Sequence, residues 1–193
     1  MAERAAAGSR RAAILRAAAG LFAARGYHGA SIEDLGRAVG TTGPALYRHF
    51  PGKEALLAAM LLEVSERLAE QGERVVAGAA GPEEALEGLL RGHIAFALGE
   101  PALITVHDRE LDNVPEPERR RIRRLQRGYA EEWVGVLARL RPARGRLALR
   151  AAVHAAFGLL NSTPHSAGEL APDAMAELLF RMGRAALLVD EGE

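Results

Sequence analysis

The chain contains no cysteine, which excludes disulfide bonds and thiolate metal ligands and is typical of a cytoplasmic protein. It also lacks any run of apolar residues long enough for a membrane-spanning helix. Arginine residues interrupt the amino-terminal stretch, which argues against a secretory signal segment. Aromatic residues are only 5% of the chain, but hydrophobic residues reach 49%, and many are alanine, a strong helix former. A sizeable core can therefore be buried.

Charge is distributed unevenly along the chain, although the formal net charge is zero. Residues 1–53 carry eight basic and three acidic side chains, a net charge of +5. Residues 54–193 carry 17 basic and 22 acidic side chains, a net charge of −5. A basic amino-terminal part on an acidic body favours a polyanionic partner for the first part only.

Hydrophobic residues recur at intervals of three and four almost everywhere, and no segment alternates cleanly with period two. This pattern predicts an all-α protein of about nine helices. The first four helices are expected to end at Gly26, at Gly40, before Pro51 and in the 78–82 region, where glycine or proline interrupts the pattern. The other five helices are predicted over residues 83–98, 102–112, 117–140, 145–161 and 173–189.

The second and third predicted helices have the spacing of a helix-turn-helix, with a turn made by a single glycine, Gly40. Ser31 is expected to cap the second helix, supported by Asp34 three positions later. Thr41 or Thr42 can cap the third helix. In such a motif the second helix of the pair lies in the major groove of DNA, and its amino-terminal residues approach the base edges.

Side chains of the third predicted helix suit contacts with DNA. Its first residues are small, and Pro44 falls in the first turn, where a missing N–H has little effect. Ala45 can touch a thymine methyl group, whereas Tyr47 and Arg48 offer donors to phosphate oxygens. Tyr47 can instead pack part of the three-helix core, and His49 can either contact phosphate or cap the carboxyl end of its helix.

A longer pattern joins these features. Gly26-Tyr27 precedes Ser31, and two further runs follow, Ile32-x-x-Leu35-Gly36-x-x-Val39-Gly40 and Leu46-Tyr47-x-His49-Phe50-x-x-Lys53-Glu54-x-Leu56. Over about residues 10–57 the chain resembles the amino-terminal domain of TetR-family transcriptional repressors. The resemblance implies an all-helical homodimer that binds a palindromic operator and releases it when a small molecule enters the carboxy-terminal domain. We expect a DNA-binding domain at 1–54 and an effector-binding and dimerisation domain at 55–193.

The resemblance also implies which residues contact DNA. These are Thr41, Thr42, Pro44, Ala45, Tyr47, Arg48, His49 and Lys53, and we add Ser31 and Gly43 to the expected DNA-binding set. Lys53 begins the fourth helix, where its charge and the exposed N–H groups make an anion site. Gly43 departs from the family, which often has a polar or basic residue there. Its small size removes one base or phosphate contact and favours readout through shape and methyl groups.

No motif in residues 58–193 indicates a particular ligand. The resemblance implies a pocket framed by the fourth to eighth helices, which would accept a hydrophobic molecule. The residues expected to line it are Met60, Val64, His93, Phe96, Ile104, His107, Leu111, Tyr129, Trp133 and Phe157. For each apolar residue taken alone, ordinary core packing is the stronger interpretation. For His93 and His107, a buried histidine with a backbone partner is commoner than a ligand-binding one.

The helix predicted at 117–140 carries one stripe of arginines, at Arg120, Arg123, Arg124 and Arg127. The favoured interpretation is a solvated face whose arginines pair with Glu116, Glu131 and their neighbours. The sharper hypothesis is phosphate binding, because this stretch resembles regulators of fatty-acid or steroid catabolism in actinobacteria, whose effectors are acyl-CoA thioesters. An arginine cluster beside an apolar channel would suit a CoA phosphate and an acyl chain.

The last two predicted helices carry longer apolar stripes than one small domain must bury. The stripes comprise Leu147, Ala151, His154, Phe157 and Gly158, then Met175, Leu178, Leu179, Met182, Ala186 and Val189. Packing this pair against a symmetry mate gives a four-helix dimer interface. Alternatively, the stripes face the protomer's own core. A dimer would place two reading helices about 34–36 Å apart, in successive major grooves.

These features predict a repressor of transcription that a small hydrophobic effector releases from its operator. The six histidines are scattered, and His93 and His107 are fourteen residues apart, which fits no metal-ligand spacing. No acidic pair or nucleophile motif accompanies them, so we expect no enzyme, no metal and no cofactor. The main alternative is a constitutive, architectural DNA-binding protein, but that function would not need a long apolar body.

Overall fold

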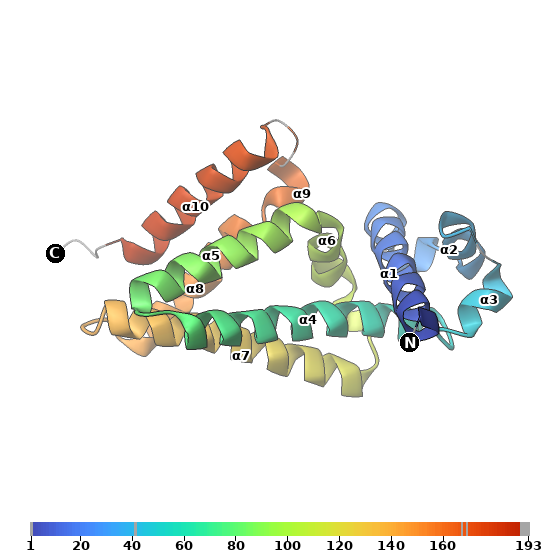
Figure 1. Ribbon diagram of the computed structural model, residues 1–193, viewed down its shortest axis with the longest axis horizontal. Helices are drawn as coiled ribbons and strands as arrows, with labels where there is room; N and C mark the ends of the chain where they lie inside the picture. The colour runs from blue at the N-terminus through green and yellow to red at the C-terminus, as the bar shows by residue number, and fades with distance from the viewer. Residues whose placement is uncertain (1, 41, 167, 169, 190–193) are drawn as a thin grey trace. The chain divides into compact units, whose positions relative to one another are not determined.

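The computed structural model describes residues 2–40, 42–166, 168 and 170–189, with side chains from Arg10 onward except at Pro44 and Ala45. These residues form ten α-helices and one 3₁₀ helix, which confirms the predicted all-α class (Figure 1). The helices are α1 (Ala2–Gly29), α2 (Ile32–Ala38), α3 (Gly43–Tyr47), α4 (Lys53–Gly78), α5 (Pro82–Gly99), α6 (Pro101–Glu110), η1 (Leu111–Asn113), α7 (Glu116–Leu140), α8 (Arg146–Leu160), α9 (Thr163–Ser166) and α10 (Pro172–Leu188).

The predicted number of nine helices omits two short elements of the described chain, η1 and α9. A single turn contains too few apolar positions to give a periodic signal, so neither element is visible in the hydrophobic pattern. In α9 the hydroxyl of Thr163 is buried and donates to the carbonyl of Ala97 at 2.7 Å. Because this contact joins residues far apart in sequence, no local sequence pattern predicts the turn.

Gly26 ends the regular part of α1, as predicted. Its backbone angles, φ 73° and ψ 165°, lie in a region that glycine adopts far more easily than other residues. Tyr27–Gly29 then form a separate short turn beyond the break. Before the break, Ile14, Ala18 and Phe22 are buried along one side of α1, which confirms the apolar stripe seen in the sequence.

Local signals also fix α2. The Ser31 hydroxyl accepts a hydrogen bond from the Asp34 backbone N–H at 3.0 Å, and the Ser31 N–H donates to the Asp34 carboxylate at 3.2 Å. This reciprocal capping box confirms the predicted start of the helix. Gly40, with φ 62°, makes the turn that follows α2. Thr42 stands at the N-cap of α3 but its side chain makes no capping hydrogen bond.

Contacts divide the chain into two compact groups. The first comprises Met1–Val64 with Ala102–Ile122, and the second comprises Ser65–Pro101 with Arg123–Glu193. In the first group α2 packs against α1 and α3, and in the second α10 packs against α5 and α8. The helices α4 and α7 contribute to both groups. The boundary predicted at residue 54 divides the sequence at one point, whereas each contact group combines two separate segments of the chain. The predicted domain boundary therefore stays a prediction.

Each group has its own buried side chains. In the first group, Phe22, Leu35 and Leu57 are at most 1% exposed. In the second, Trp133 is fully buried among aliphatic residues of α5, α7, α8 and α10. Among the described residues, no single helix is both long and apolar enough to cross a membrane.

Candidate nucleic-acid interface and buried aromatic cluster

Three consecutive polar side chains face solvent at the end of α3: Tyr47 is its last residue, and Arg48 and His49 follow it. Tyr47 is 53% exposed, and Arg48 and His49 are exposed as well. The flanking residues Leu46 and Phe50 are buried, as predicted, and they anchor the segment to the core. Tyr47 is therefore not a buried core residue, and the alternative in which it packs part of the three-helix core stays untested. An exposed aromatic ring with a hydroxyl, next to two nitrogen donors, is suited to phosphate oxygens.

The structure describes only part of the entry to α3. Thr42 is exposed, whereas Gly43 is half-buried, with its Cβ direction facing Ile32 Cγ2 at 3.5 Å. Thr41 lies outside the described residues, as do the side chains of Pro44 and Ala45. Base contacts by these residues stay predictions.

Ser31 and Lys53, both expected at DNA, already have partners within the protein. Ser31 is exposed but its hydroxyl belongs to the capping box of α2. The Lys53 ammonium donates to the carbonyl of Ala30 at 3.0 Å and lies 4.4 Å from the centroid of the Tyr27 ring. An ammonium group has three donors, so Lys53 keeps hydrogen-bonding capacity for a phosphate.

The Asp34 carboxylate of α2 is paired locally. Asp34 accepts hydrogen bonds from the backbone and hydroxyl of Ser31, and these two bonds are the main reason that its pKa lies below the ordinary value. Arg25, 3.4 Å from the Asp34 carboxylate, and Arg37 form ion pairs with it. The negative charge of Asp34 is thus largely compensated, which reduces its repulsion of an anion at this surface.

The ten residues expected to line an effector pocket fall into two sets. Met60, Val64, Ile104, His107 and Leu111 belong to the first group, whereas His93, Phe96, Tyr129, Trp133 and Phe157 belong to the second. In the first set, Met60, Val64 and Ile104 are buried apolar residues, and half-buried His107 has its Nδ1 3.3 Å from an Asp108 carboxylate oxygen. The second set is in mutual contact, and we call it the aromatic cluster.

His93 is the centre of the aromatic cluster. Its ring stacks on Phe157, with 4.9 Å between the ring centroids, and on Tyr129 at 5.9 Å. Trp133 and Phe96 meet the His93 ring edge-on, at 6.0 and 5.8 Å. The Tyr129 ring fits beside α4 because residue 72 is glycine; a Cβ there would lie 2.8 Å from Tyr129 Cε2.

Two side chains bind the nitrogens of the buried His93. Nε2 is 3.0 Å from the amide oxygen of Asn161, and Nδ1 is 3.3 Å from the Tyr129 hydroxyl. Because an amide oxygen only accepts, Nε2 donates to Asn161 and Nδ1 accepts from Tyr129. Burial lowers the pKa of His93 to about 4, with the Asn161 bond opposing it, so the ring is neutral near pH 7. The expected backbone partner of His93 is wrong.

The aromatic cluster also contains an unsatisfied donor. The Trp133 indole nitrogen is buried and makes no hydrogen bond of ordinary geometry with the described residues. Burial raises the pKa of the nearby Tyr129 hydroxyl, and the Trp133 indole opposes that shift. Leaving a buried donor unpaired costs about 1–3 kcal/mol. An oxygen acceptor on a bound molecule would recover part of that free energy.

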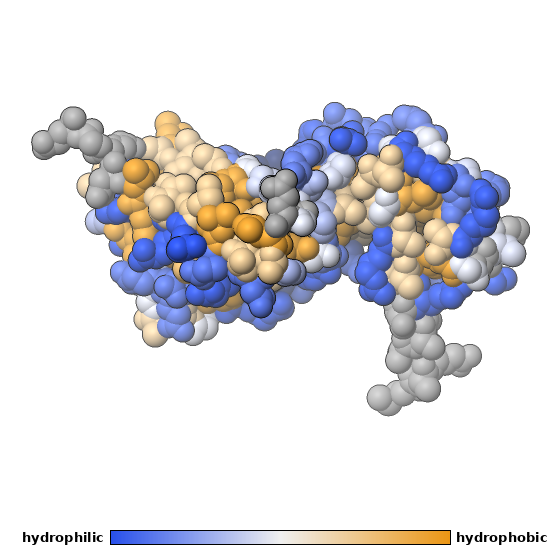
Figure 2. Space-filling model, turned by 90° about the horizontal axis from the view of Figure 1, so that it is seen from above, coloured by the Kyte–Doolittle hydropathy of each residue, from blue (hydrophilic) through white to orange (hydrophobic). Residues whose placement is uncertain are grey.

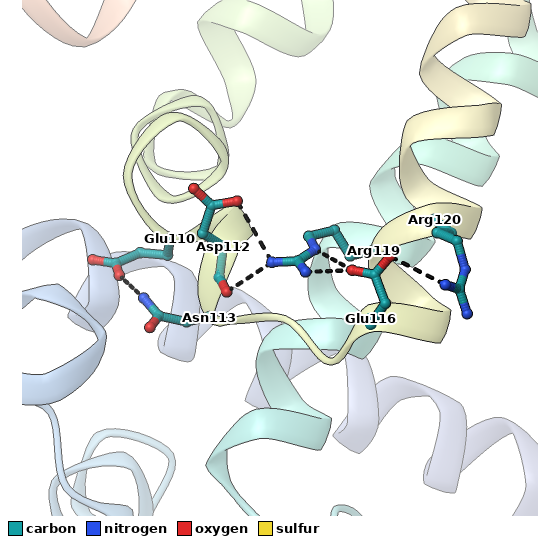
Figure 3. A network of polar contacts seen from close by, with 6 residues as sticks. All are labelled: Glu110, Asp112, Asn113, Glu116, Arg119 and Arg120. Carbon is teal, nitrogen blue, oxygen red and sulfur yellow. Dashed lines mark hydrogen bonds and ion pairs between the residues drawn. The ribbon is translucent and has the colours of Figure 1, made fainter.

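The arginines of α7 are only partly paired as expected. Arg120 lies 3.2 Å from the Glu116 carboxylate, and the Arg119 Nε donates to the same carboxylate at 2.9 Å (Figure 3). The predicted pairing of the stripe with Glu131 is wrong, because Glu131 binds Arg146 and Arg150 of α8, each at 2.6 Å. These two bonds are the main reason that the pKa of Glu131 is lowered.

Two other arginines of that stripe face solvent. Arg124 and Arg127 are exposed and form no ion pair within the described part of the chain.

The apolar stripes of the last two helices divide between core and surface. Met175 and Leu179 are buried in the protomer, so for them the alternative of core packing is correct. Another set on α8 is exposed at intervals of four, three and four residues: Leu147, Ala151, His154 and Gly158. On α10, Met182 is 47% exposed, and Val189 follows that helix at 57%. Figure 2 shows apolar residues gathered on the face that carries α10.

Comparison with known proteins covers both parts of the chain. Residues 14–60 match the family model of bacterial regulatory proteins of the tetR family, and residues 79–187 match that of the tetracyclin repressor-like C-terminal domain. The chain belongs to the TetR family. Its α2 and α3 are therefore the helix-turn-helix of an amino-terminal DNA-binding domain, which a helical carboxy-terminal domain follows.

Individual relatives agree with this TetR-family assignment. Over 130 residues the chain is 27% identical to the HTH-type transcriptional repressor KstR2 of Mycobacterium tuberculosis (strain ATCC 25618 / H37Rv). The matched stretch spans 67% of this chain and 65% of KstR2, so it covers just under two thirds of that repressor's length. A TetR-family transcriptional regulator from Bordetella parapertussis 12822 is 27% identical, with a TM-score of 0.81, over 95% of this chain and 98% of that one. AibR, solved with isovaleryl coenzyme A and operator DNA, shares the fold, with a TM-score of 0.70 and 23% identity over 90% of this chain and 97% of AibR.

Sequence reasoning missed three residues that the structure ties to these sites in the TetR-family chain. Asn161 ends α8 and binds His93, and its only sequence signal is a polar residue at the end of an apolar helix. Glu110 and Tyr27 are joined by a buried hydrogen bond between α6 and α1. Tyr27 was part of the family pattern, but nothing local in the sequence links it to Glu110.

Proposed function

We propose that this TetR-family protein is a transcriptional repressor that binds a palindromic operator as a homodimer in the cytoplasm and releases it when a small hydrophobic effector binds. The observation that carries the proposal is the exposed run Tyr47-Arg48-His49 at the carboxyl end of α3, held between buried Leu46 and Phe50. A reading helix needs this arrangement, because its donors must reach DNA while its apolar side fixes its orientation.

The DNA contacts form two classes in this proposal. Thr41, Thr42, Pro44 and Ala45 approach base edges at the start of α3, with Gly43 leaving room for the approach. Tyr47, Arg48, His49, Ser31 and Lys53 bind phosphate oxygens and set the position of the helix on the duplex. The net charge of +5 over residues 1–53 supports this division, because phosphate contacts dominate the affinity.

The dimer contact uses α8 and α10. The exposed stripe from Leu147 to Gly158 carries an alanine and a glycine, so a second helix can approach closely. Nothing lies within 4 Å of the Cβ direction of Gly158. Exposed Met182 and Val189 extend the apolar surface. Sedimentation analysis is expected to give a dimer, and replacing Gly158 by Arg, which leaves the protomer's core untouched, is expected to give folded monomers.

The effector binds in the second group, beside the aromatic cluster. Its polar part meets the Trp133 indole donor, and its apolar part lies against Phe96 and Phe157. An acyl-CoA fits this description, since a thioester carbonyl is an acceptor and the exposed Arg124 and Arg127 lie on the same helix as Trp133. The AibR complex with isovaleryl coenzyme A supports this class of effector.

Release requires that the effector bind more tightly to the conformation that does not fit the operator, because equal affinity shifts no equilibrium. In the proposed mechanism the pocket helices rearrange, and α4 moves as a lever that transmits the change to α2 and α3. Two reading helices whose separation departs from about 34 Å no longer fit successive major grooves. We expect the affinity for DNA to fall while the dimer stays intact.

The deciding experiment is an electrophoretic shift with DNA from upstream of the protein's own gene, repeated with isovaleryl-CoA and a long-chain acyl-CoA. A repressor of the proposed kind shifts the fragment and loses the shift with one acyl-CoA but not with free coenzyme A. A shift that persists with both acyl-CoA compounds contradicts the proposal that the effector is an acyl-CoA. A persistent shift with cell metabolites as well indicates an architectural protein. No shift at low ionic strength contradicts the DNA-binding function itself.

A further inference from the structure

Glu110 is the only buried carboxylate among the described side chains, with an exposed fraction of 7%. It is the last residue of α6, and its Oε1 accepts the backbone N–H of Tyr27 at 3.0 Å. Its other oxygen accepts from the side-chain amide of Asn113 at 2.8 Å. Figure 3 shows its carboxylate pointing away from the neighbouring pair of Asp112, in η1, and Arg119. A buried carboxylate is costly unless it is hydrogen-bonded, so this placement needs both partners.

The acceptor of the Tyr27 N–H is located where α1 breaks. At Gly26 the chain leaves the helical conformation, and the next N–H donates to Glu110. The Cβ direction of Gly26 points toward the same carboxylate oxygen, 3.5 Å away. Glycine at this position therefore permits the backbone turn and sits directly against the acceptor. A residue at the end of α6 thus fixes the backbone between α1 and α2.

Tyr27 continues the connection toward α4. Its ring lies 4.4 Å below the Lys53 ammonium, which also donates to Ala30, one residue before the cap of α2. The Tyr27 ring packs against Phe22 as well, with 5.7 Å between the ring centroids. The position of Lys53 at the first turn of α4 therefore depends on Tyr27, and the position of Tyr27 depends on Glu110.

We propose that Glu110 is a positioning residue for DNA binding: by holding the Tyr27 N–H, with Asn113 orienting its carboxylate, it fixes the break in α1 and through Tyr27 the place of Lys53. We call Glu110, Asn113 and Tyr27 the latch. The inference rests on the proposed function only in naming DNA as the partner. Because a hydrogen bond of 3.0 Å is lost when its atoms move apart by about 1 Å, a small displacement of the end of α6 opens the latch.

The first test measures the latch without DNA. Hydrogen exchange of the Tyr27 amide, followed by NMR, is expected to be about 10- to 100-fold faster in Glu110→Ala, because a hydrogen bond to a charged acceptor is lost. Glu110→Gln keeps an oxygen acceptor and is expected to keep most of the protection. Asp112→Ala, which removes an exposed carboxylate of the same loop, is expected to leave Tyr27 unchanged. Equal exchange in wild type and Glu110→Ala overturns the proposal.

The second test measures binding to the upstream DNA fragment. Glu110→Ala is expected to weaken it about tenfold at unchanged dimer content, with Glu110→Gln close to wild type and Asp112→Ala equal to it. If Glu110 had only a structural role, Glu110→Ala would lower the melting temperature, but the DNA affinities of the three variants would not follow this order. That result would overturn the proposal. If the wild-type protein did not bind DNA, the proposed function would be wrong. The latch would still be tested separately, because the exchange of the Tyr27 amide is measured without DNA.

A third variant guards against unfolding of Glu110→Ala. Asn113→Ala leaves the carboxylate in place but removes the donor that orients it. We expect severalfold faster exchange at Tyr27 and a smaller loss of DNA affinity in the same direction. A folded Asn113→Ala protein with wild-type values for both quantities would contradict the latch even if the Glu110→Ala protein could not be prepared.

Discussion

The Lys53 ammonium lies 4.4 Å from the centroid of the Tyr27 ring, so a residue expected to bind phosphate is also part of the protein's own framework. Replacing Lys53 by Met keeps the aliphatic stem and removes the charge. A cation–π contact of this kind contributes about 0.5–1 kcal/mol, and we expect a loss of about 1 kcal/mol in the free energy of unfolding.

The same Lys53→Met variant tests the DNA contact, because each phosphate contact adds about one unit to the slope of log affinity against log salt. We expect the slope to fall by about one in Lys53→Met and to be retained in Lys53→Arg. Urea unfolding and filter binding at several salt concentrations measure the two quantities. A loss of stability with an unchanged slope would show that Lys53 serves only the framework.

Tyr47 offers the opposite case, because it is 53% exposed and is not a buried core residue. Replacing Tyr47 by Ala is expected to leave the free energy of unfolding within about 0.5 kcal/mol of wild type and to weaken DNA binding about tenfold or more. The neighbouring Leu46→Ala provides the comparison, since removing a buried leucine destabilises by about 2–5 kcal/mol. If Tyr47→Ala bound DNA as tightly as wild type, the assigned contact face of α3 would be wrong.

The helix-turn-helix could be predicted from sequence because its determinants are local. Ser31 and Asp34 are three residues apart and form the capping box that their spacing predicts. Gly26 and Gly40 both have the positive φ that their positions imply. In each case the partners are neighbours along the chain, so residue type and interval carry most of the information.

The sequence could predict which residues belong to the aromatic cluster, but not which hydrogen-bond partners they have. His93 was expected to have a backbone partner, but Asn161, 68 residues away, accepts from it. Likewise, Glu131 was expected to pair within α7, yet α8 supplies Arg146 and Arg150. Contacts of this kind depend on which helix faces meet, and a single sequence does not record that pairing.

Gly26 should resist substitution. A Cβ at φ 73° and ψ 165° is strained by about 1–3 kcal/mol, so Gly26→Ala is expected to destabilise by that amount. Gly20 provides a matched control in the same helix, because its Cβ direction meets nothing within 4 Å. Gly20→Ala is expected to stabilise by about 0.5–1 kcal/mol, since alanine favours a helix interior. Thermal or urea unfolding of both variants checks the contrast; equal effects would mean that the break at Gly26 is not fixed by its backbone angles.

His93 makes stability depend on pH, and the sign follows from its lowered pKa. The unfolded chain binds a proton below about pH 6.5, whereas the buried ring binds one only near pH 4. Between these values the unfolded state holds more protons, so stability falls as the pH falls. From pH 6.5 to 5 the loss from this residue alone is about 1.5 kcal/mol, because the unfolded ring is only half protonated at pH 6.5.

Urea unfolding at pH 5, 6 and 7 measures this dependence, with His93→Gln as the comparison. Glutamine removes the titrating ring but leaves the other five histidines, which contribute equally in both proteins. The variant is expected to be less stable at pH 7, because the stacking on Phe157 is lost, yet to lose less stability on acidification. Parallel curves for the two proteins would mean that His93 takes up its proton in the folded state at an ordinary pH, and the closed aromatic cluster around it would then be incorrect.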